Sequence, residues 1–161
     1  MCTPRVIMVA ENTLLSIQHL SVRFGRKGDY SEVVHDVSFD IAPGEKLALV
    51  GESGSGKTVT ALSILQLHDA SQVSYPQGTI GYGGRDLLRL EEDAIRHLRG
   101  KEIAMIFQEP MTALNPVQPI GEQLMEPLLV HAGLNKTAAR KRMLELLDRT
   151  GIVDPDKRFD A

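Results

Sequence analysis

One run of eight residues, Gly-Glu-Ser-Gly-Ser-Gly-Lys-Thr from Gly51 to Thr58, could bind a phosphate group. It fits the pattern G-x-x-x-x-G-K-[ST], in which glycines let successive backbone N–H groups point toward one phosphate. We expect the ammonium of Lys57 to reach the β- and γ-phosphates of a nucleotide. The hydroxyl of Thr58 is an oxygen ligand suited to Mg²⁺. The alternative reading of the same run is a flexible glycine turn.

The segments on either side favour the phosphate-binding interpretation. Residues 47–50 form an unbroken apolar run, which is typical of a strand covered on both faces. Residues 57–67 lack Gly and Pro and carry apolar side chains at three- and four-residue spacing, which predicts a helix. A strand, a glycine loop and a helix in this order are the context that the phosphate loop needs.

The remaining elements follow from hydrophobic periodicity and from turn residues. Apolar residues from Leu15 to Phe24 alternate with one slip in phase, which predicts a strand interrupted by a bulge or a turn, and a polar turn follows at residues 25–29. Further predicted strands cover residues 37–41, 79–82 and 103–107, and further predicted helices cover residues 86–99, 121–132 and 136–150.

Composition and charge restrict the class of protein. The 161 residues are 42% apolar and 24% charged, as expected for a compact globular domain rather than a fibrous or disordered one. A formal charge of -3 provides no overall positive field, so nucleic acid is not the expected partner. Cys2 is the only cysteine, which excludes an internal disulfide and fits a reducing compartment, and the five histidines lack metal-ligand spacing.

Four further segments resemble the ATP-binding subunits of ABC transporters. They are L-S-V-R-F at 20–24, V-H-D-V-S-F-D-I at 34–41, R-G-K-E-I-A-M-I-F-Q-E-P at 99–110 and M-T-A-L-N-P at 111–116. Together with the phosphate loop they are similar to the peptide and nickel importer group, which includes dipeptide, oligopeptide and microcin C type ATPases. The resemblance implies an α/β fold: a truncated P-loop NTPase nucleotide-binding domain of the ABC type, with an antiparallel β portion and the start of a helical subdomain.

The resemblance also implies a division of the chain. Residues 1–10 would be an N-terminal extension, residues 11–107 the ATP-binding core, and residues 108–161 the Q-loop with part of the helical subdomain.

Specific site residues are carried over by the same resemblance. It implies a Walker A site for ATP and Mg²⁺ formed by Gly51, Ser53, Gly54, Ser55, Gly56, Lys57 and Thr58. Lys57 and Gln108 are then catalytic, with Thr58 and Gln108 as Mg²⁺ contacts; without the family, Gln108 is a solvated residue at a strand end. Phe24 is expected to stack on adenine, with Tyr30 as a second candidate, and the alternative for Phe24 is a core residue ending a strand.

The resemblance further predicts what this chain does. The family's L-S-G-G-Q signature, its apolar strand ending in Asp-Glu and its switch histidine do not occur in the sequence. We therefore expect the first half to two-thirds of the domain, with strands that expose unpaired edges, and a chain that binds Mg-ATP but hydrolyses negligible amounts alone.

For the full-length protein the resemblance implies ATP-driven peptide import at the cytoplasmic face of the inner membrane. The implied partners are transmembrane permease subunits and a second ATPase domain, fused or separate, with an indirect link to a substrate-binding protein. A non-catalytic nucleotide-binding module and another kind of P-loop NTPase remain as alternatives.

Two surface features have two readings each. The helix at residues 136–150 is locally basic, which is typical of a solvated helix face but also fits an acidic partner or lipid surface. An apolar group follows Gln108 and would contact the membrane subunits or pack the helical subdomain's own core. Its members are Leu114, Pro116, Val117, Ile120 and Leu124.

Overall fold

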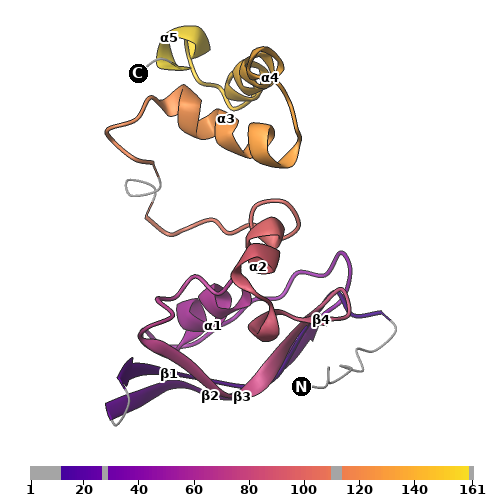
Figure 1. Cartoon of the computed structure of the whole chain (residues 1–161), viewed down its shortest axis with the longest axis vertical. Helices are drawn as coiled ribbons and strands as arrows, with labels where there is room; N and C mark the ends of the chain where they lie inside the picture. Colours follow the sequence, from indigo (N-terminus) through magenta and orange to yellow (C-terminus); the bar gives the residue numbers. More distant parts are fainter. Residues whose placement is uncertain (1–11, 27–28, 110–113, 160–161) are drawn as a thin grey trace. The chain divides into compact units, whose positions relative to one another are not determined.

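A computed structural model describes residues 12–26, 29–109 and 114–159 of the chain. The chain divides into two compact units, residues 1–96 and residues 97–161 (Figure 1). The predicted extension at residues 1–10 lies outside the described residues. The predicted boundary between residues 107 and 108 falls inside the second unit, and the functional division that it proposes stays a prediction.

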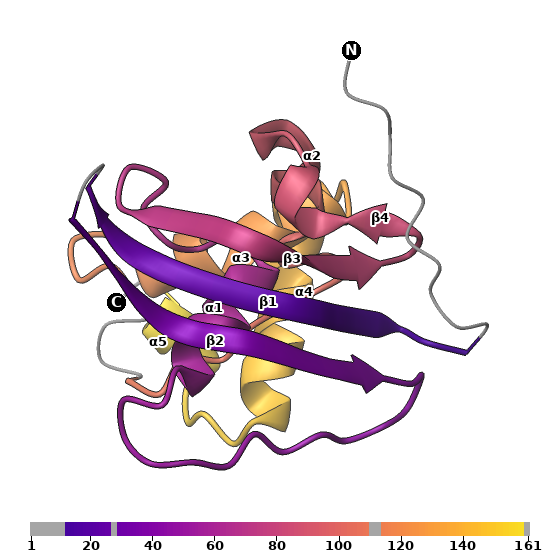
Figure 2. The ribbon, with the colours of Figure 1, turned by 90° about the horizontal axis from the view of Figure 1, so that it is seen from below.

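The first unit is built on an antiparallel sheet. Its strands are β1 (Leu15–Arg26), β2 (Asp29–Ile41), β3 (Val73–Tyr82) and β4 (Arg85–Asp86), in the order β2-β1-β3-β4. Figure 2 looks onto this sheet and shows β1 between β2 and β3. The predicted interruption of the first strand is confirmed as an irregular, bulge-like register, because the β1–β2 register shifts between Ile17 and Leu20 and again before and after Val22.

Helix α1 (Lys57–Ile64) lies against one face of the sheet, as both ribbon views show (Figures 1 and 2). This face and α1 form the core of the unit. Ile17, Leu20, Val22 and Ile80 are fully buried. Burying each such side chain contributes about 1.5–3 kcal/mol, so the alternation in β1 fixes which face of the sheet receives the helix.

Helix α1 ends at Ile64, before the predicted end at residue 67. Gln66 has a φ of 48°, in the left-handed region. The backbone N–H groups of Gln66 and Leu67 donate to the carbonyls of Ser63 (3.2 Å) and Leu62 (3.0 Å), as in a Schellman cap. The prediction was too long because no Gly or Pro signals this end; the cap uses a glutamine.

The predicted strands at residues 47–50 and 103–107 are wrong for this structure. Among the described residues, no strand pairs with either segment beyond one isolated bridge between Arg99 and Ile103. Val50 is 92% exposed and Ile106 is 98% exposed. An apolar run becomes a strand only when neighbours satisfy its N–H and C=O groups, and sequence periodicity cannot show whether those neighbours are present.

The predicted helix at residues 86–99 occurs as two shorter elements. A 3₁₀ turn, η1 (Leu87–Arg89), is followed by α2 (Glu92–Leu98), with Leu90 in an extended conformation between them. The carboxylate of Asp86 accepts the N–H groups of Ile80 and Leu88, each at 3.2 Å. Asp86 therefore caps the turn and competes with a continuous helix.

Beyond α2, the described part of the second unit contains the helices α3 (Ile120–His131), α4 (Lys136–Arg149) and α5 (Pro155–Phe159). The predicted helices at 121–132 and 136–150 are confirmed within one residue at each end, whereas α5 was not predicted. Ala139, Met143 and Phe159 are buried. A Cβ atom at Gly121 would lie 2.2 Å from the Phe159 ring, so glycine permits this contact between α3 and α5. Of the helices in the described ranges, none combines the length and apolar character needed to cross a membrane.

We predict that Asn135→Ala lowers the stability of the second unit by about 1 kcal/mol, because the Asn135 side chain caps α4. Its amide oxygen accepts the Ala138 N–H at 2.9 Å. Urea unfolding followed by circular dichroism measures the change. Asn135→Asp keeps the acceptor and is the control; equal losses in both variants would contradict the capping role.

A second prediction compares two glycines of similar backbone geometry. Gly54 and Gly56 have φ values of 83° and 87°. A Cβ at Gly56 would meet Val34 Cγ2 at 2.9 Å and the Val33 carbonyl oxygen at 3.0 Å, whereas a Cβ at Gly54 meets nothing within 4 Å. Gly54→Ala should therefore incur only the left-handed strain of about 1–2 kcal/mol, and Gly56→Ala about 1–3 kcal/mol more from overpacking. Thermal unfolding of both variants tests this difference, and equal melting temperatures would refute it.

Candidate nucleotide-binding site

The loop from Gly51 to Gly56 leads directly into helix α1. Gly56 is the N-cap residue, and α1 has neither a side-chain cap nor an acidic residue in its first turn. Within the described part of the chain, the backbone N–H groups of Gly54, Gly56 and Lys57 have no backbone acceptor. These donors and the positive end of the helix dipole together form a site that favours an anion.

Lys57 lies across the loop. Its ammonium donates to the carbonyl oxygens of Gly51 (2.8 Å) and Glu52 (2.6 Å) and to the Ser55 hydroxyl (3.2 Å). Three acceptors match the three hydrogens of the ammonium, which hold the loop in a closed turn. A phosphate oxygen is a charged acceptor and can replace these neutral ones through stronger hydrogen bonds.

The loop is fixed to the sheet at its last residue. Gly56 is buried, and a Cβ atom at this position would lie 2.9 Å from Val34 Cγ2 and 3.0 Å from the Val33 carbonyl oxygen of β2. The Gly56 carbonyl accepts the Thr60 N–H (2.8 Å) and the Thr60 hydroxyl (3.0 Å). Residues 51–55 are exposed. The buried residue Gly56 therefore sets the position of an exposed loop that a ligand can reach.

Thr58 follows Lys57 in the first turn of α1, and its side chain is exposed. Its hydroxyl oxygen fits Mg²⁺, which prefers oxygen ligands and keeps several waters. No group of three or more His, Cys, Asp or Glu side chains able to hold a metal occurs among the described residues. A phosphate group bound in the loop would supply charged oxygen ligands to such an ion.

Phe24 lies near the end of β1, on the side of the sheet that faces α1. Its main chain pairs with Ser31 of β2 and Val73 of β3. The ring is half-buried and makes an edge contact with His68, with ring centroids 5.0 Å apart and an interplanar angle of 83°. His68 was noted in the sequence only as one of five histidines without metal-ligand spacing, and no sequence signal indicated this contact.

Tyr30, the second aromatic candidate, lies on the other face of the sheet. The guanidinium carbon of Arg23 lies 4.5 Å from the centre of the Tyr30 ring. Because side chains alternate along a strand, Arg23 and Phe24 point to opposite faces, and Tyr30 shares the face of Arg23. Phe24 therefore lies on the same face of the sheet as α1, and Tyr30 does not, which favours Phe24 as the residue that would stack on a base (the base platform). The stacking of adenine on Phe24 stays a prediction.

Gln108 belongs to the second unit, where its side chain is exposed. The phosphate loop belongs to the first unit. The predicted role of Gln108 at the bound nucleotide therefore stays a prediction.

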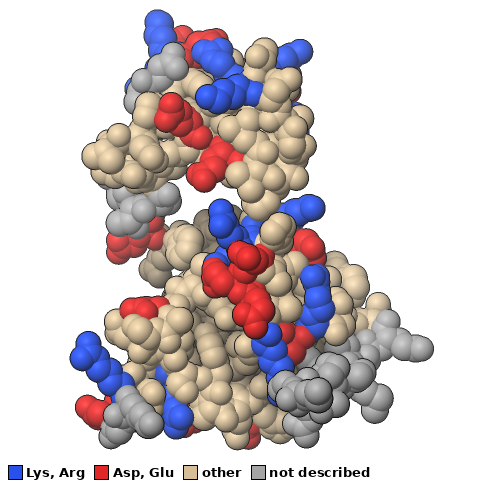
Figure 3. Space-filling model, in the orientation of Figure 1, with Lys and Arg blue, Asp and Glu red and all other residues tan. Residues whose placement is uncertain are grey.

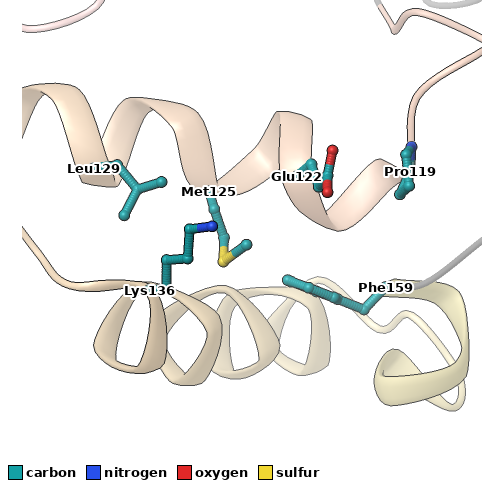
Figure 4. A pocket seen from close by; sticks show the side chains of 6 residues that line it. All are labelled: Pro119, Glu122, Met125, Leu129, Lys136 and Phe159. Carbon is teal, nitrogen blue, oxygen red and sulfur yellow. The ribbon is translucent and has the colours of Figure 1, made fainter.

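The second unit contains a groove between α3, α4 and α5, shown in Figure 4. Its volume is about 520 Å³, and its lining is Pro119, Glu122, Met125, Leu129, Lys136 and Phe159. None of the predicted site residues lines it.

Figure 3 shows that basic and acidic side chains are interspersed over the visible surface of each unit. On α4, Arg140 pairs with Asp156 (3.1 Å) and Arg142 with Glu145 (3.3 Å), so part of its basic charge is already paired.

Comparison with known proteins places this chain in a family. The ABC transporter family model matches residues 34–160. The peptidoglycan transport ATP-binding protein YejF of Agrobacterium fabrum is 52% identical over 148 residues, which cover 92% of this chain and 27% of that protein. The oligopeptide transport ATP-binding protein OppD of Bacillus subtilis is 42% identical, over 95% of this chain and 43% of its own length. The chain thus spans less than half the length of these curated relatives.

A solved structure shows the same fold. The dimeric structure of a bacterial ABC transporter cassette superposes with a TM-score of 0.73 at 22% identity, over 91% of this chain and 60% of that chain. The fold class and family expected from the sequence are confirmed. The chain belongs to the ABC transporter family.

Proposed function

We propose that this chain is the nucleotide-binding part of an ATPase that drives peptide import. The observation that carries the proposal is the loop at residues 51–58, where unpaired backbone N–H groups, the Lys57 ammonium and the start of α1 converge. The names of relatives support the substrate class, since those proteins are called oligopeptide and dipeptide transport ATP-binding proteins.

In this proposal each part of the loop has one task. The free N–H groups and Lys57 bind the phosphates of ATP, and Lys57 exchanges its contacts with Gly51 and Glu52 for phosphate oxygens. Thr58 holds Mg²⁺, which neutralises charge on the phosphates when bound. Phe24 stacks on the adenine, and Gln108 approaches the γ-phosphate and its metal.

The proposed partners are transmembrane permease subunits and a second ATPase domain, with an indirect link to a substrate-binding protein. The proposed location is the cytoplasmic face of the inner membrane.

We predict that Lys57→Ala weakens Mg-ATP binding by about tenfold or more, because it removes a charge-assisted contact with phosphate. Isothermal titration calorimetry on the 161-residue chain measures the affinity. Lys46→Ala removes an exposed lysine that precedes the loop and is the matched control. Equal affinities for the wild-type chain and Lys57→Ala would overturn the proposed function.

A further prediction concerns turnover. The sequence contains neither L-S-G-G-Q nor an apolar strand ending in Asp-Glu, the groups expected to complete the site and activate water. We expect the isolated chain to bind Mg-ATP and to release phosphate only at the background rate. A steady phosphate release that Lys57→Ala abolishes would show that this expectation is wrong.

The two aromatic candidates can be separated by a matched pair of variants. Phe24→Ala should weaken ATP binding by about 1–3 kcal/mol, the usual contribution of a base–aromatic stack, whereas Tyr30→Ala should leave it unchanged. Calorimetry on both variants provides the comparison. A loss in Tyr30→Ala alone would move the base platform to the other face of the sheet.

A further inference from the structure

His68 connects the Phe24 ring to the helix that begins at the phosphate loop. Its Nε2 atom lies 3.0 Å from the carbonyl oxygen of Val59. A carbonyl oxygen only accepts hydrogen bonds, so this nitrogen carries the proton and donates it. Val59 stands directly after Thr58 in the first turn of α1. The imidazole is thereby tied to the turn that carries Lys57 and Thr58.

The same imidazole forms a T-shaped contact with the Phe24 ring, with 5.0 Å between the ring centroids and 83° between the ring planes. This is the favoured geometry for a pair of aromatic rings. Pairing with Ser31 and Val73 fixes the main chain of Phe24. The direction of the ring depends on its side-chain neighbours, and His68 is one of them.

The chain after His68 is also held in place. Asp69 accepts the Ser71 hydroxyl (2.7 Å), the Ser71 N–H (2.9 Å) and the Gln72 side-chain amide (2.9 Å). These hydrogen bonds, first that of the Ser71 hydroxyl, lower the pKa of the Asp69 carboxyl. The Gln72 carbonyl accepts the Gly25 N–H at 2.9 Å, beside Phe24. The turn that carries His68 is therefore joined to the end of β1.

We infer that His68 is a positioning residue, which sets the orientation of Phe24 relative to the phosphate loop. The inference rests on the proposed function and on Phe24 as the base platform. The contact runs from the ring through the imidazole to Val59, so it couples the place of the base to the place of the phosphates. An unsupported Phe24 ring would sample other rotamers, and each binding event would then incur the cost of ordering it.

The test compares a ligand with a base and a ligand without one. In the 161-residue chain, His68→Ala should weaken Mg-ATP binding about three- to tenfold, a part of the stacking contribution, and leave Mg-tripolyphosphate binding unchanged. His35→Ala, on an exposed histidine of β2, is the matched control and should change neither affinity. His68→Gln keeps a donor for Val59 without the ring, so it should reproduce the loss and serves if the alanine variant unfolds.

Coupling between the two residues gives a second readout. In the His68→Ala/Phe24→Ala double variant, the loss of ATP affinity should equal that of Phe24→Ala alone, because His68 acts through that ring. Equal losses for ATP and tripolyphosphate would assign His68 a purely structural role and overturn the inference. An unchanged ATP affinity in both His68 variants would overturn it as well. If instead Lys57→Ala leaves tripolyphosphate and ATP binding unchanged, the proposed function fails, and the inference fails with it.

Discussion

The close approach of Gly56 to β2 is the constraint on which the candidate site depends. Its φ of 87° turns the chain from the loop into α1, and the absence of a Cβ leaves room for Val34 Cγ2 and the Val33 carbonyl oxygen, which a Cβ would meet at 2.9 and 3.0 Å. The free N–H groups of the loop, the lysine and the helix dipole converge only because this one residue is both left-handed and in contact with the sheet. The antiparallel sheet thus acts as the support for the phosphate loop.

The residues proposed to bind the two ends of the nucleotide belong to the same unit of the chain. In the proposed binding mode, the phosphate side rests on Gly56 next to β2, and the base side rests on Phe24 in β1. β1 and β2 pair along most of their length, so the distance between the two sides is set by a hydrogen-bonded ladder. His68 adds a side-chain link between them through Val59. Such a site is preorganised, which lowers the entropy lost on binding.

Some elements could be predicted because local chemistry determines them. The apolar alternation in β1 and the helical spacing in α4 are local patterns; α4 lies within one residue of its predicted bounds, and β1 starts at the predicted residue and ends two residues later than predicted. The segments 47–50 and 103–107 could not be predicted, because an apolar run records a preference for burial but not the presence of a pairing partner. The end of α1 was also missed, because its cap uses Gln66 in place of glycine.

For the site, the sequence alone determined the residue types and their order. Gly51 to Thr58 make a phosphate loop recognisable, since only glycines, a lysine and a hydroxyl at this spacing provide its donors. Only the tertiary structure decided the aromatic neighbour. Strand alternation places Phe24 on the α1 side and Tyr30 on the other, and the cap of α1 leads the chain back so that His68 meets Phe24. The loop depends on local backbone geometry, whereas these contacts join residues far apart in the chain, which no local pattern encodes.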